Sequence, residues 1–448
     1  MKNILLIYPP FCTPACPPYS LTYLYAFLRD NLSVVKFNIS VIDLNLFFHE
    51  QKFNKYRSLF QNVEIEKYDE ISKEFKIETS KIYRENNKKI VNNKKPDLLN
   101  EILDEILKSK PDTVAFSVVY SSQMFYTKVL VEELKKKGIK TIVGGPAVND
   151  LIHPDLILKN EIELLNAIDP NIKHDDVNCD TVLDFNIWNL DDYFISTPVI
   201  PIRTTSTCYY QKCVFCSHHN NGTYFETPLV NIKKSIIKSK QKYFFFTDDL
   251  ISKKRLLDIA AIMPKGSKWM CQLKPTIDLD KETLVILQKS GLKNIIWGLE
   301  SGSDRVLKLM KKGTNTVDIK QVLGDSHSVG IKNIVYIMFG FPSETADEFK
   351  ETIDFLKEND KNIDLISTSI FGLQKGTHIY ENYKDYGITK IIEQKRTVLE
   401  PKISYEVENG LSTKDVQKLR KKIQKTIEKI NKFPKNMNFF REHMLLIE

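Results

Sequence analysis

The chain has 448 residues, of which 42% are apolar and 27% are charged, and these proportions are typical of a folded globular protein. They exclude a collagen-like, mucin-like or wholly disordered chain. The 65 Lys and Arg residues exceed the 57 Asp and Glu residues by 8, an excess that permits an acidic partner but does not require nucleic acid. At roughly 150 residues per domain, the length predicts about three units.

The N-terminus and the cysteine content indicate the compartment. The apolar run at residues 3–8 stops at Pro9 and Pro10, so it is shorter than the apolar core of a signal peptide. No window approaches the roughly 20 apolar residues of a membrane span. Seven cysteines are too few for a disulfide framework, and three of them fall within nine residues, which is typical of metal ligation in a reducing compartment. We therefore expect a cytoplasmic protein without a transmembrane segment.

The first 150 residues alternate between apolar runs and amphipathic stretches. Strands are expected at 3–8, 37–43, 113–119 and 140–143, and helices at 21–32 and 124–137. This order predicts a Rossmann-like, doubly wound parallel sheet, with a helical insertion in the Lys-, Glu- and Asn-rich stretch 50–100. Ligands bind such sheets at the carboxyl ends of the strands. Those ends carry Pro10, Ser117, Gly144 and Gly145.

A second α/β series follows a polar linker at 151–200, in which one short helix is expected near 156–168. Six strands are expected at 202–206, 243–247, 269–273, 294–298, 333–339 and 365–371. Helical patterns separate them, so the segment 201–400 predicts a partial (β/α)6 TIM barrel, in which the chemistry lies at the carboxyl-end loops. The remainder, 401–448, is expected to be a helical region with a Lys-rich helix from 412 to 432.

Three cysteines follow the first strand of this second series. Cys208, Cys213 and Cys216 lie on one short loop. Three thiolates can hold three corners of a [4Fe–4S] cluster and leave the fourth iron open to an exogenous ligand. A zinc site completed by His218 or His219 is the alternative.

Three further stretches lie behind the cysteines, in a fixed order. They are 244–249 (FFFTDD), 298–303 (GLESGS) and 338–345 (MFGFPSET). With these stretches, the chain resembles radical S-adenosylmethionine (SAM) enzymes of the group that carries an N-terminal cobalamin-binding domain. Most members have three residues between the first two cysteines, whereas this chain has four, a variant that a subset of the cobalamin-associated group shares.

The resemblance implies a set of cofactor ligands. Cys208, Cys213 and Cys216 would hold the [4Fe–4S] cluster, and SAM would chelate its open iron and be cleaved to a 5′-deoxyadenosyl radical. The residues that would contact SAM are Phe215, Asp248, Asp249, Glu300, Ser301, Gly340 and Pro342. Two of these residues have a structural alternative: Phe215 as a core aromatic residue and Asp249 as the N-cap of the next helix. Ser303 has an N-cap as its alternative too.

The resemblance also implies cobalamin at Pro10, Ser117, Gly144 and Gly145, where the glycines would let a flat corrin approach. A doubly wound sheet without a ligand fits the same residues. No Asp-x-His-x-x-Gly motif is present, so a lower axial imidazole is not expected. After Gly145 such domains usually continue through another strand and a Gly-Glu-Gly-Glu-like loop, whereas the segment 147–180 is short and lacks that loop. Cys12 and Cys16 are a second metal pair or ordinary loop thiols, and Cys179 and Cys271 are expected to be packing residues.

The expected function is cobalamin-dependent methylation of an unactivated carbon, with a small molecule, a lipid or a peptide as the substrate. An electron donor such as flavodoxin or ferredoxin is expected as a partner, and nucleic acid is not. The alternatives are a non-methylating radical rearrangement or cyclisation, an RNA-modifying methylthiotransferase, and a non-enzymatic cobalamin or metal sensor.

Overall fold

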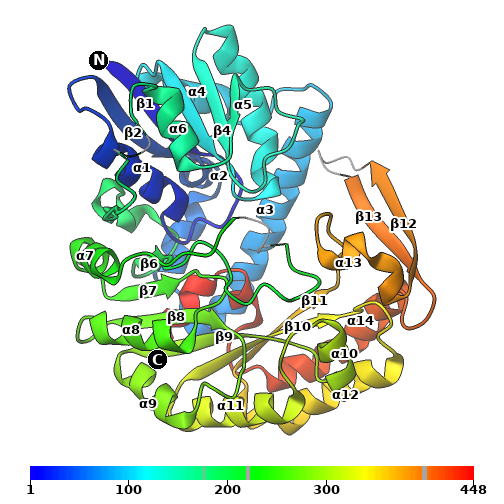
Figure 1. The fold of residues 1–448 in the computed structure, drawn as a ribbon. Helices are drawn as coiled ribbons and strands as arrows, with labels where there is room; N and C mark the ends of the chain where they lie inside the picture. Colours follow the sequence, from blue (N-terminus) through cyan, green and yellow to red (C-terminus); the bar gives the residue numbers. More distant parts are fainter. Residues whose placement is uncertain (174, 176, 218–221, 396–400, 448) are drawn as a thin grey trace. The chain divides into compact units, whose positions relative to one another are not determined.

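The structure is a computed structural model that describes residues 1–447 apart from 174, 176, 218–221 and 396–400. It divides into two compact units, each with its own parallel sheet (Figure 1). The N-terminal unit contains Met1–Pro201 and Val230–Gln241, and the C-terminal unit contains Ile202–Leu229, Lys242–Lys395 and Pro401–Glu448. Across the described residues, no helix combines the length and the apolar character needed to cross a membrane.

The sheet of the N-terminal unit has five parallel strands in the order β2-β1-β3-β4-β5. Their bounds are β1 (Lys2–Tyr8), β2 (Phe37–Asp43), β3 (Thr113–Ser117), β4 (Lys140–Gly144) and β5 (Leu156–Leu158). The strand order reverses between β1 and β3, which is where doubly wound sheets bind ligands. The predicted Rossmann-like fold is therefore confirmed.

Helices cover this sheet and fill the predicted insertion. Their bounds are α1 (Tyr19–Asn31), α2 (Leu44–Gln61), α3 (Tyr68–Val91), α4 (Leu99–Lys108), α5 (Met124–Lys136) and α6 (Glu161–Ile168). The insertion has an apolar core of its own, because Phe53, Phe60 and Phe75 of α2 and α3 are buried with ring centroids 5.4–5.9 Å apart. Burying such aromatic rings stabilises the helix pair.

The expectation of a helix at 156–168 was only half right. Residues 156–158 form β5, which pairs with β4, and the helix begins only at Glu161. The side chain of Asn160 accepts a hydrogen bond from the backbone N–H of Glu163 and thereby fixes the helix start, as an N-cap residue does. The sheet thus has a strand beyond Gly145, where the sequence had indicated none.

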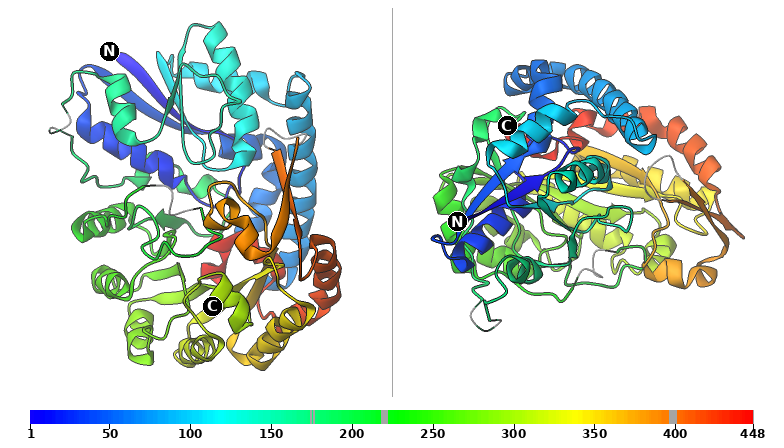
Figure 2. Two further views of the ribbon diagram at one scale, coloured as in Figure 1. Left: turned by 45° about the vertical axis from the view of Figure 1, so that its right-hand side comes forward. Right: turned by 90° about the horizontal axis from the view of Figure 1, so that it is seen from above.

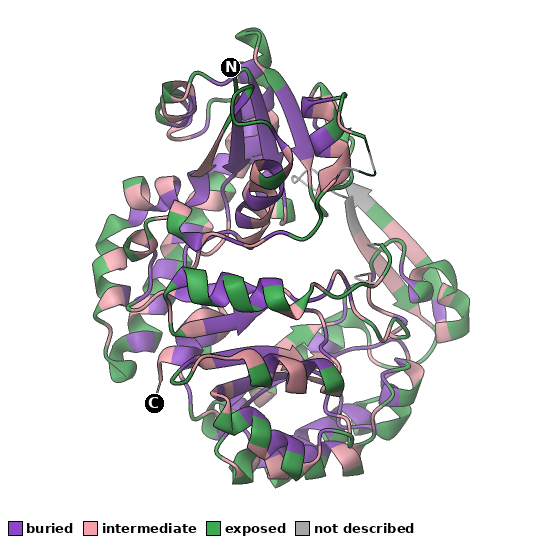
Figure 3. Cartoon of the chain, turned by 60° about the vertical axis from the view of Figure 1, so that its left-hand side comes forward, coloured by how far each residue is buried: buried purple, intermediate pink, exposed green. Residues whose placement is uncertain are grey.

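The sheet of the C-terminal unit has six strands in the order β11-β10-β9-β8-β7-β6, and the pairs from β7 to β11 are parallel. Their bounds are β6 (Val199–Ile202), β7 (Tyr243–Phe246), β8 (Lys268–Leu273), β9 (Leu292–Glu300), β10 (Lys332–Phe339) and β11 (Leu365–Ile370). The central strands of both sheets are buried (Figure 3), whereas the edge strands β2 and β5 of the N-terminal sheet are mostly of intermediate exposure. The six-strand partial barrel is confirmed.

The first strand of this barrel lies earlier than predicted, at 199–202 instead of 202–206. The reason is a buried carboxylate. The backbone N–H groups of Thr204 and Thr205 donate to Asp248 Oδ1 over 2.8 and 2.7 Å. Because these two N–H groups bond to the carboxylate and not to a neighbouring strand, β6 ends at Ile202.

Seven helices follow the strands of the C-terminal unit among the residues described. They are α8 (Lys253–Ile262), α9 (Lys281–Lys289), α10 (Asp304–Leu309), α11 (Thr316–Ser328), α12 (Ala346–Glu358), α13 (His378–Glu381) and α14 (Thr413–Ile430). Helix α7 (Leu229–Ser239) lies between β6 and β7 in the chain, and residues 230–241 pack with the N-terminal unit.

The C-terminal region is not wholly helical as expected. Strands β12 (Ile388–Lys395) and β13 (Pro401–Val407) form an antiparallel pair, visible as a two-stranded ribbon in both views of Figure 2. Alternate residues of the pair, among them Ile391, Ile403 and Tyr405, pack on an apolar cluster of the unit. This two-residue period is a strand pattern, and the expected Lys-rich helix begins after it, as α14.

Candidate functional site

The loop that carries the three cysteines is anchored to the segment after α10. The backbone N–H of Val214 donates to the carbonyl of Met310 over 3.1 Å, and the Tyr210 hydroxyl donates to the carbonyl of Lys311 over 2.9 Å. Gly313 is required beside this contact, because a Cβ there would stand 2.3 Å from the Tyr210 hydroxyl oxygen. The loop is therefore held on both sides of Lys212 and Cys213.

The three cysteines form no disulfide and are of intermediate exposure. The backbone N–H of Cys216 donates to the carbonyl of Cys213, which closes a turn between two of them. Within the described ranges, no three His, Cys, Asp or Glu side chains are gathered as around a single metal ion. The ligands of a [4Fe–4S] cluster each bind a different iron, so they need not converge on one point. The histidines of the zinc alternative, His218 and His219, lie outside the described residues.

An ion pair between the buried Lys312 and the partly buried Glu300 lies beside this loop. Lys312 Nζ is 2.8 Å from Glu300 Oε1, and the Lys312 ammonium is 5.9 Å from the centroid of the Phe215 ring. Burial works to lower the pKa of Lys312, but Glu300 and the nearby Cys213 outweigh it and raise that pKa. A side chain at Gly298 would stand 2.9 Å from Lys312 Nζ. The predicted residues Cys213, Phe215 and Glu300 are thus brought together around a lysine that the sequence analysis missed.

A second buried lysine follows β8 directly. The Lys274 ammonium lies 3.3 Å from the centroid of the Tyr210 ring, a close cation–π contact. Burial is the main cause that lowers the pKa of Lys274 to about 8, and Cys213 opposes it. The signal for this residue in the sequence is its position, since it is a charged residue at the carboxyl end of a buried barrel strand.

The two aspartates after β7 have different surroundings. Asp248 is fully buried: its Oδ1 accepts from Thr204 and Thr205, and its Oδ2 has no hydrogen-bond partner among the described residues. Burial raises the pKa of Asp248. Asp249 instead pairs with Arg203 over 2.9 Å. It does not cap α8, because the N-cap of that helix is Ser252.

The Ser301 side chain is buried inside the C-terminal unit. It is fully buried, its Oγ is 3.2 Å from Thr352 Oγ1, and the backbone N–H of Ser303 donates to it over 3.1 Å. Ser303 is the N-cap residue of α10, but its side chain makes no capping hydrogen bond. The structure therefore does not bring Ser301 to the Lys312–Glu300 pair.

The stretch after β10 packs against α14. Gly340 has φ +79°, and a Cβ there would be 2.9 Å from a methyl carbon of Val416. Its backbone N–H donates to Glu344 Oε2, whereas Glu344 Oε1 is buried without a partner in the described part of the chain. Burial raises the pKa of Glu344 to about 7. Pro342 is buried beside it. Gly340 is thus required by the α14 contact, whatever else it serves.

The candidate residues of the N-terminal unit lie at the carboxyl edge of its sheet. A Cβ on Gly145 would be 2.3 Å from the carbonyl oxygen of Val118, and one on Gly144 would be 3.2 Å from that of Leu158. The Ser117 hydroxyl donates to Ser20 Oγ of α1 over 2.8 Å. Pro10 is buried. The close approach of two loops is therefore a sufficient reason for Gly145.

The other four cysteines form no disulfide either. Cys12 and Cys16 are half-buried, and Cys12 Sγ lies 3.6 Å from the Tyr8 hydroxyl. Cys271 is fully buried in β8, as a packing residue is, whereas Cys179 is exposed. The expectation that Cys179 is a packing residue was therefore wrong.

The comparisons with known proteins agree with this arrangement. Residues 202–356 match the radical SAM superfamily. The bacteriochlorophyllide d C-12(1)-methyltransferase of Chlorobaculum tepidum is 28% identical over 199 residues, which are 42% of this chain and 43% of that protein. The match thus spans less than half the length of this curated relative.

Two solved structures share the fold. The radical SAM methyltransferase TsrM from Kitasatospora setae, with cobalamin and a [4Fe–4S] cluster bound, superposes with a TM-score of 0.60 at 14% identity, covering 90% of this chain and 83% of TsrM. The cobalamin-dependent SAM radical enzyme OxsB, with aqua-cobalamin bound, gives 0.63 at 14% identity, covering 96% and 67%. The predicted resemblance is confirmed, and this chain carries a domain of the radical SAM superfamily in the overall fold of TsrM and OxsB.

Proposed function

We propose that this protein is a radical SAM enzyme that methylates an unactivated carbon with the help of cobalamin. The observation that carries the proposal is the loop of three cysteines outside any disulfide, anchored beside the Lys312–Glu300 ion pair inside the matched domain. When bound, the cluster and SAM supply a hydrogen-abstracting 5′-deoxyadenosyl radical, and cobalamin supplies a methyl group.

The donor set of the cysteine loop fits the cluster. Cys208, Cys213 and Cys216 offer three thiols and no oxygen ligand, and thiolates are what iron–sulfur clusters take. The loop starts where Asp248 fastens Thr204 and Thr205. We assign Asp248 as a positioning residue, because it fixes the point from which the chain leaves β6 toward the cysteines.

The charged residues beside the loop fit SAM, which carries an ammonium and a carboxylate on one carbon. Glu300 offers a carboxylate to the ammonium and Lys312 offers an ammonium to the carboxylate, so a bound amino acid group finds both partners in one place. Before SAM binds, Lys312 and Glu300 pair with each other, so each charge is compensated by the other.

Cobalamin is assigned to the carboxyl edge of the N-terminal sheet, at Pro10, Ser117, Gly144 and Gly145. Support comes from the strand order, which reverses between β1 and β3, where such sheets bind ligands. It also comes from Gly144 and Gly145, which have no side chains at the positions assigned to the corrin. Support for methylation comes from the relatives, since one is named as a methyltransferase of bacteriochlorophyllide d and TsrM as a radical SAM methyltransferase.

The partners in this proposal are a small-molecule, lipid or peptide substrate and an electron donor such as flavodoxin or ferredoxin. None of the seven cysteines, all of which the structure describes, is in a disulfide, which fits work in a reducing compartment such as the cytoplasm.

The test is anaerobic reconstitution with iron and sulfide, followed by reduction and addition of SAM. We expect release of 5′-deoxyadenosine, together with retention of corrin through gel filtration after loading with hydroxocobalamin. Iron-loaded, reduced protein that leaves SAM intact would contradict the radical assignment. Protein that cleaves SAM but retains no corrin would contradict only the cobalamin assignment.

A further inference from the structure

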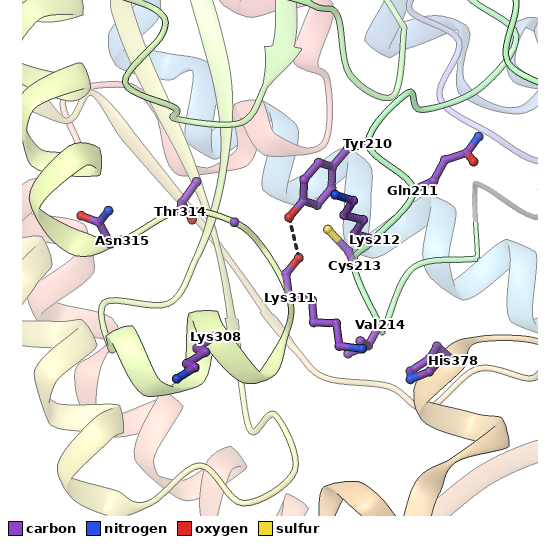
Figure 4. Close-up of a pocket in the computed structure, with 11 residues that line it drawn as sticks. Tyr210, Gln211, Lys212, Cys213, Val214, Lys308, Lys311, Thr314, Asn315 and His378 are labelled. Atoms are coloured by element: carbon purple, nitrogen blue, oxygen red, sulfur yellow. Dashed lines mark hydrogen bonds between the residues drawn. The ribbon is translucent and has the colours of Figure 1, made fainter.

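An open pocket of about 730 Å³ lies on the cysteine loop (Figure 4). Its lining includes Tyr210, Lys212 and Cys213 from the loop, and Lys308, Lys311 and Thr314 from the segment around the end of α10. Three of these residues are lysines, and no Asp or Glu lines the pocket. The pocket is therefore a concentration of positive charge at one of the proposed cluster ligands.

The pocket opens on the other side of the chain from the Lys312–Glu300 pair. Lys311 and Gly313 are exposed and line it, whereas Lys312 between them is buried and turned to Glu300. Apart from Cys213, none of the residues assigned to the cluster or to SAM lines the pocket. It is thus separate from the proposed SAM site but reaches the same thiol.

The positive charge of the pocket is not neutralised by the protein. Lys212, Lys308 and Lys311 are exposed, and none of them forms an ion pair with a residue that the structure describes. The nearest acidic side chains along the chain are engaged elsewhere: Asp304 accepts from the backbone N–H and the hydroxyl of Thr316. Such a charged concavity focuses the field and attracts a partner of opposite sign.

We propose that this pocket is the docking site of a small acidic one-electron carrier protein. The inference rests on the proposed function, because it needs a cluster at Cys208, Cys213 and Cys216. In the step, the docked carrier loses one electron and the cluster gains it, with no bond formed or broken and no proton moved. A protein is favoured over a small anion because the three lysines are exposed on long side chains at the rim and are not buried around one point.

The first test measures how fast a reduced flavodoxin of net negative charge reduces the cluster in the reconstituted protein, followed by stopped-flow absorbance. The variant Lys212→Glu/Lys308→Glu/Lys311→Glu is compared with Lys421→Glu/Lys422→Glu/Lys425→Glu, which reverses three exposed lysines of α14. At low salt we expect the pocket variant to lower the second-order rate constant by about 10-fold or more. We expect the α14 variant to change it by less than about 3-fold, with the salt dependence retained.

A small cationic reductant, reduced methyl viologen, provides the control. It needs no docking site, and the glutamates of the pocket variant attract a cation, so a rate in that variant at least as high as in the unaltered protein shows that the cluster is intact. Binding of the oxidised flavodoxin to each protein, measured by calorimetry, gives a readout without turnover. We expect the pocket variant to weaken it by about 10-fold or more. The milder variant Lys308→Gln/Lys311→Gln covers the case in which the triple variant does not fold.

Three outcomes would overturn the inference. In the first, the pocket variant is reduced by the carrier and binds it like the unaltered protein. In the second, the α14 variant is the slow one. In the third, inorganic phosphate binds the pocket and the carrier does not. The proposed function has a separate test, since failure to cleave SAM with reduced methyl viologen would reject it without any carrier protein present.

Discussion

The carboxyl edges of the two sheets use their polar groups differently. In the C-terminal unit, Asp248 Oδ2 and Glu344 Oε1 are buried with no hydrogen-bond partner in the described part of the chain, and Lys274 is buried beside the cysteine loop. In the N-terminal unit the corresponding groups are satisfied. The side chain of Gln123 donates to the carbonyl of Pro9 and accepts from the backbone N–H of Val119.

This difference indicates what each edge is made to bind. Buried polar atoms without partners are costly unless something else satisfies them, so the C-terminal edge suits a charged, polar ligand such as SAM. An edge whose polar groups are already paired makes no such demand, in keeping with the corrin that we propose for the N-terminal sheet.

The largest effect is expected at the cysteines. Cys213→Ser should abolish SAM cleavage and remove most of the bound iron after reconstitution, because an alcohol replaces a thiolate ligand. Iron content and visible absorbance measure this. Cys179→Ser changes an exposed thiol of the other unit and should retain both. Equal iron in the two variants would show that Cys213 is not a ligand.

The next effect is expected at the Lys312–Glu300 pair. Lys312→Met should weaken SAM binding by about 10-fold or more, because it removes the cation for the SAM carboxylate and leaves the partly buried Glu300 without its counter-charge. Equilibrium binding of SAM to reconstituted protein checks this. Lys311→Met alters the neighbouring, exposed lysine and should leave SAM binding within about 2-fold of the unaltered protein. Equal losses in both variants would remove Lys312 from the site.

The carboxyl edge of the N-terminal sheet is tested at Gly145, with Gly138, which precedes β4, as the control. Gly145→Ala should lower the free energy of unfolding by about 3 kcal/mol or more, because its Cβ would meet the Val118 carbonyl at 2.3 Å and its φ is +119°. Gly138 has φ +74° with nothing within 4 Å of a Cβ, so Gly138→Ala should cost only about 1 kcal/mol. Urea unfolding measures both. If the two costs are equal, the two loops do not pack as described.

The smallest effect is a dependence on pH. Burial raises the pKa of Glu344 to about 7 from its ordinary value of 4.5. The unfolded chain therefore loses its proton first as pH rises, and the folded state loses up to about 3 kcal/mol between pH 4.5 and 7. Glu344→Gln should thus stabilise the protein at pH 8 and have no effect near pH 4.5. Urea unfolding at the two pH values checks the sign, and stabilisation at the lower pH would contradict it.

The sequence predicts much of this structure because its strands are buried, apolar runs, and its cysteines follow one of them. The partial barrel, the doubly wound sheet and the cysteine loop could all be expected on those grounds. Lys274 and Lys312 could not, since a lysine in the sequence does not reveal that it is buried beside a thiol. The shift of β6 also depends on Asp248, which is more than 40 residues away along the chain.

The packing role of Gly340 was missed for a similar reason. Its neighbour is Val416 of α14, and no local pattern connects the two positions. The β12–β13 pair was missed because Lys and Glu dilute its alternating apolar residues.

The central claim is that three thiolates leave one iron free for SAM. The most direct measurement is the electron paramagnetic resonance spectrum of the reduced, reconstituted protein with and without SAM. We predict that SAM changes the spectrum of the unaltered protein and that Lys312→Met needs more SAM for the same change. A spectrum that SAM leaves unaltered, or purified protein that carries zinc in place of iron, would contradict the account.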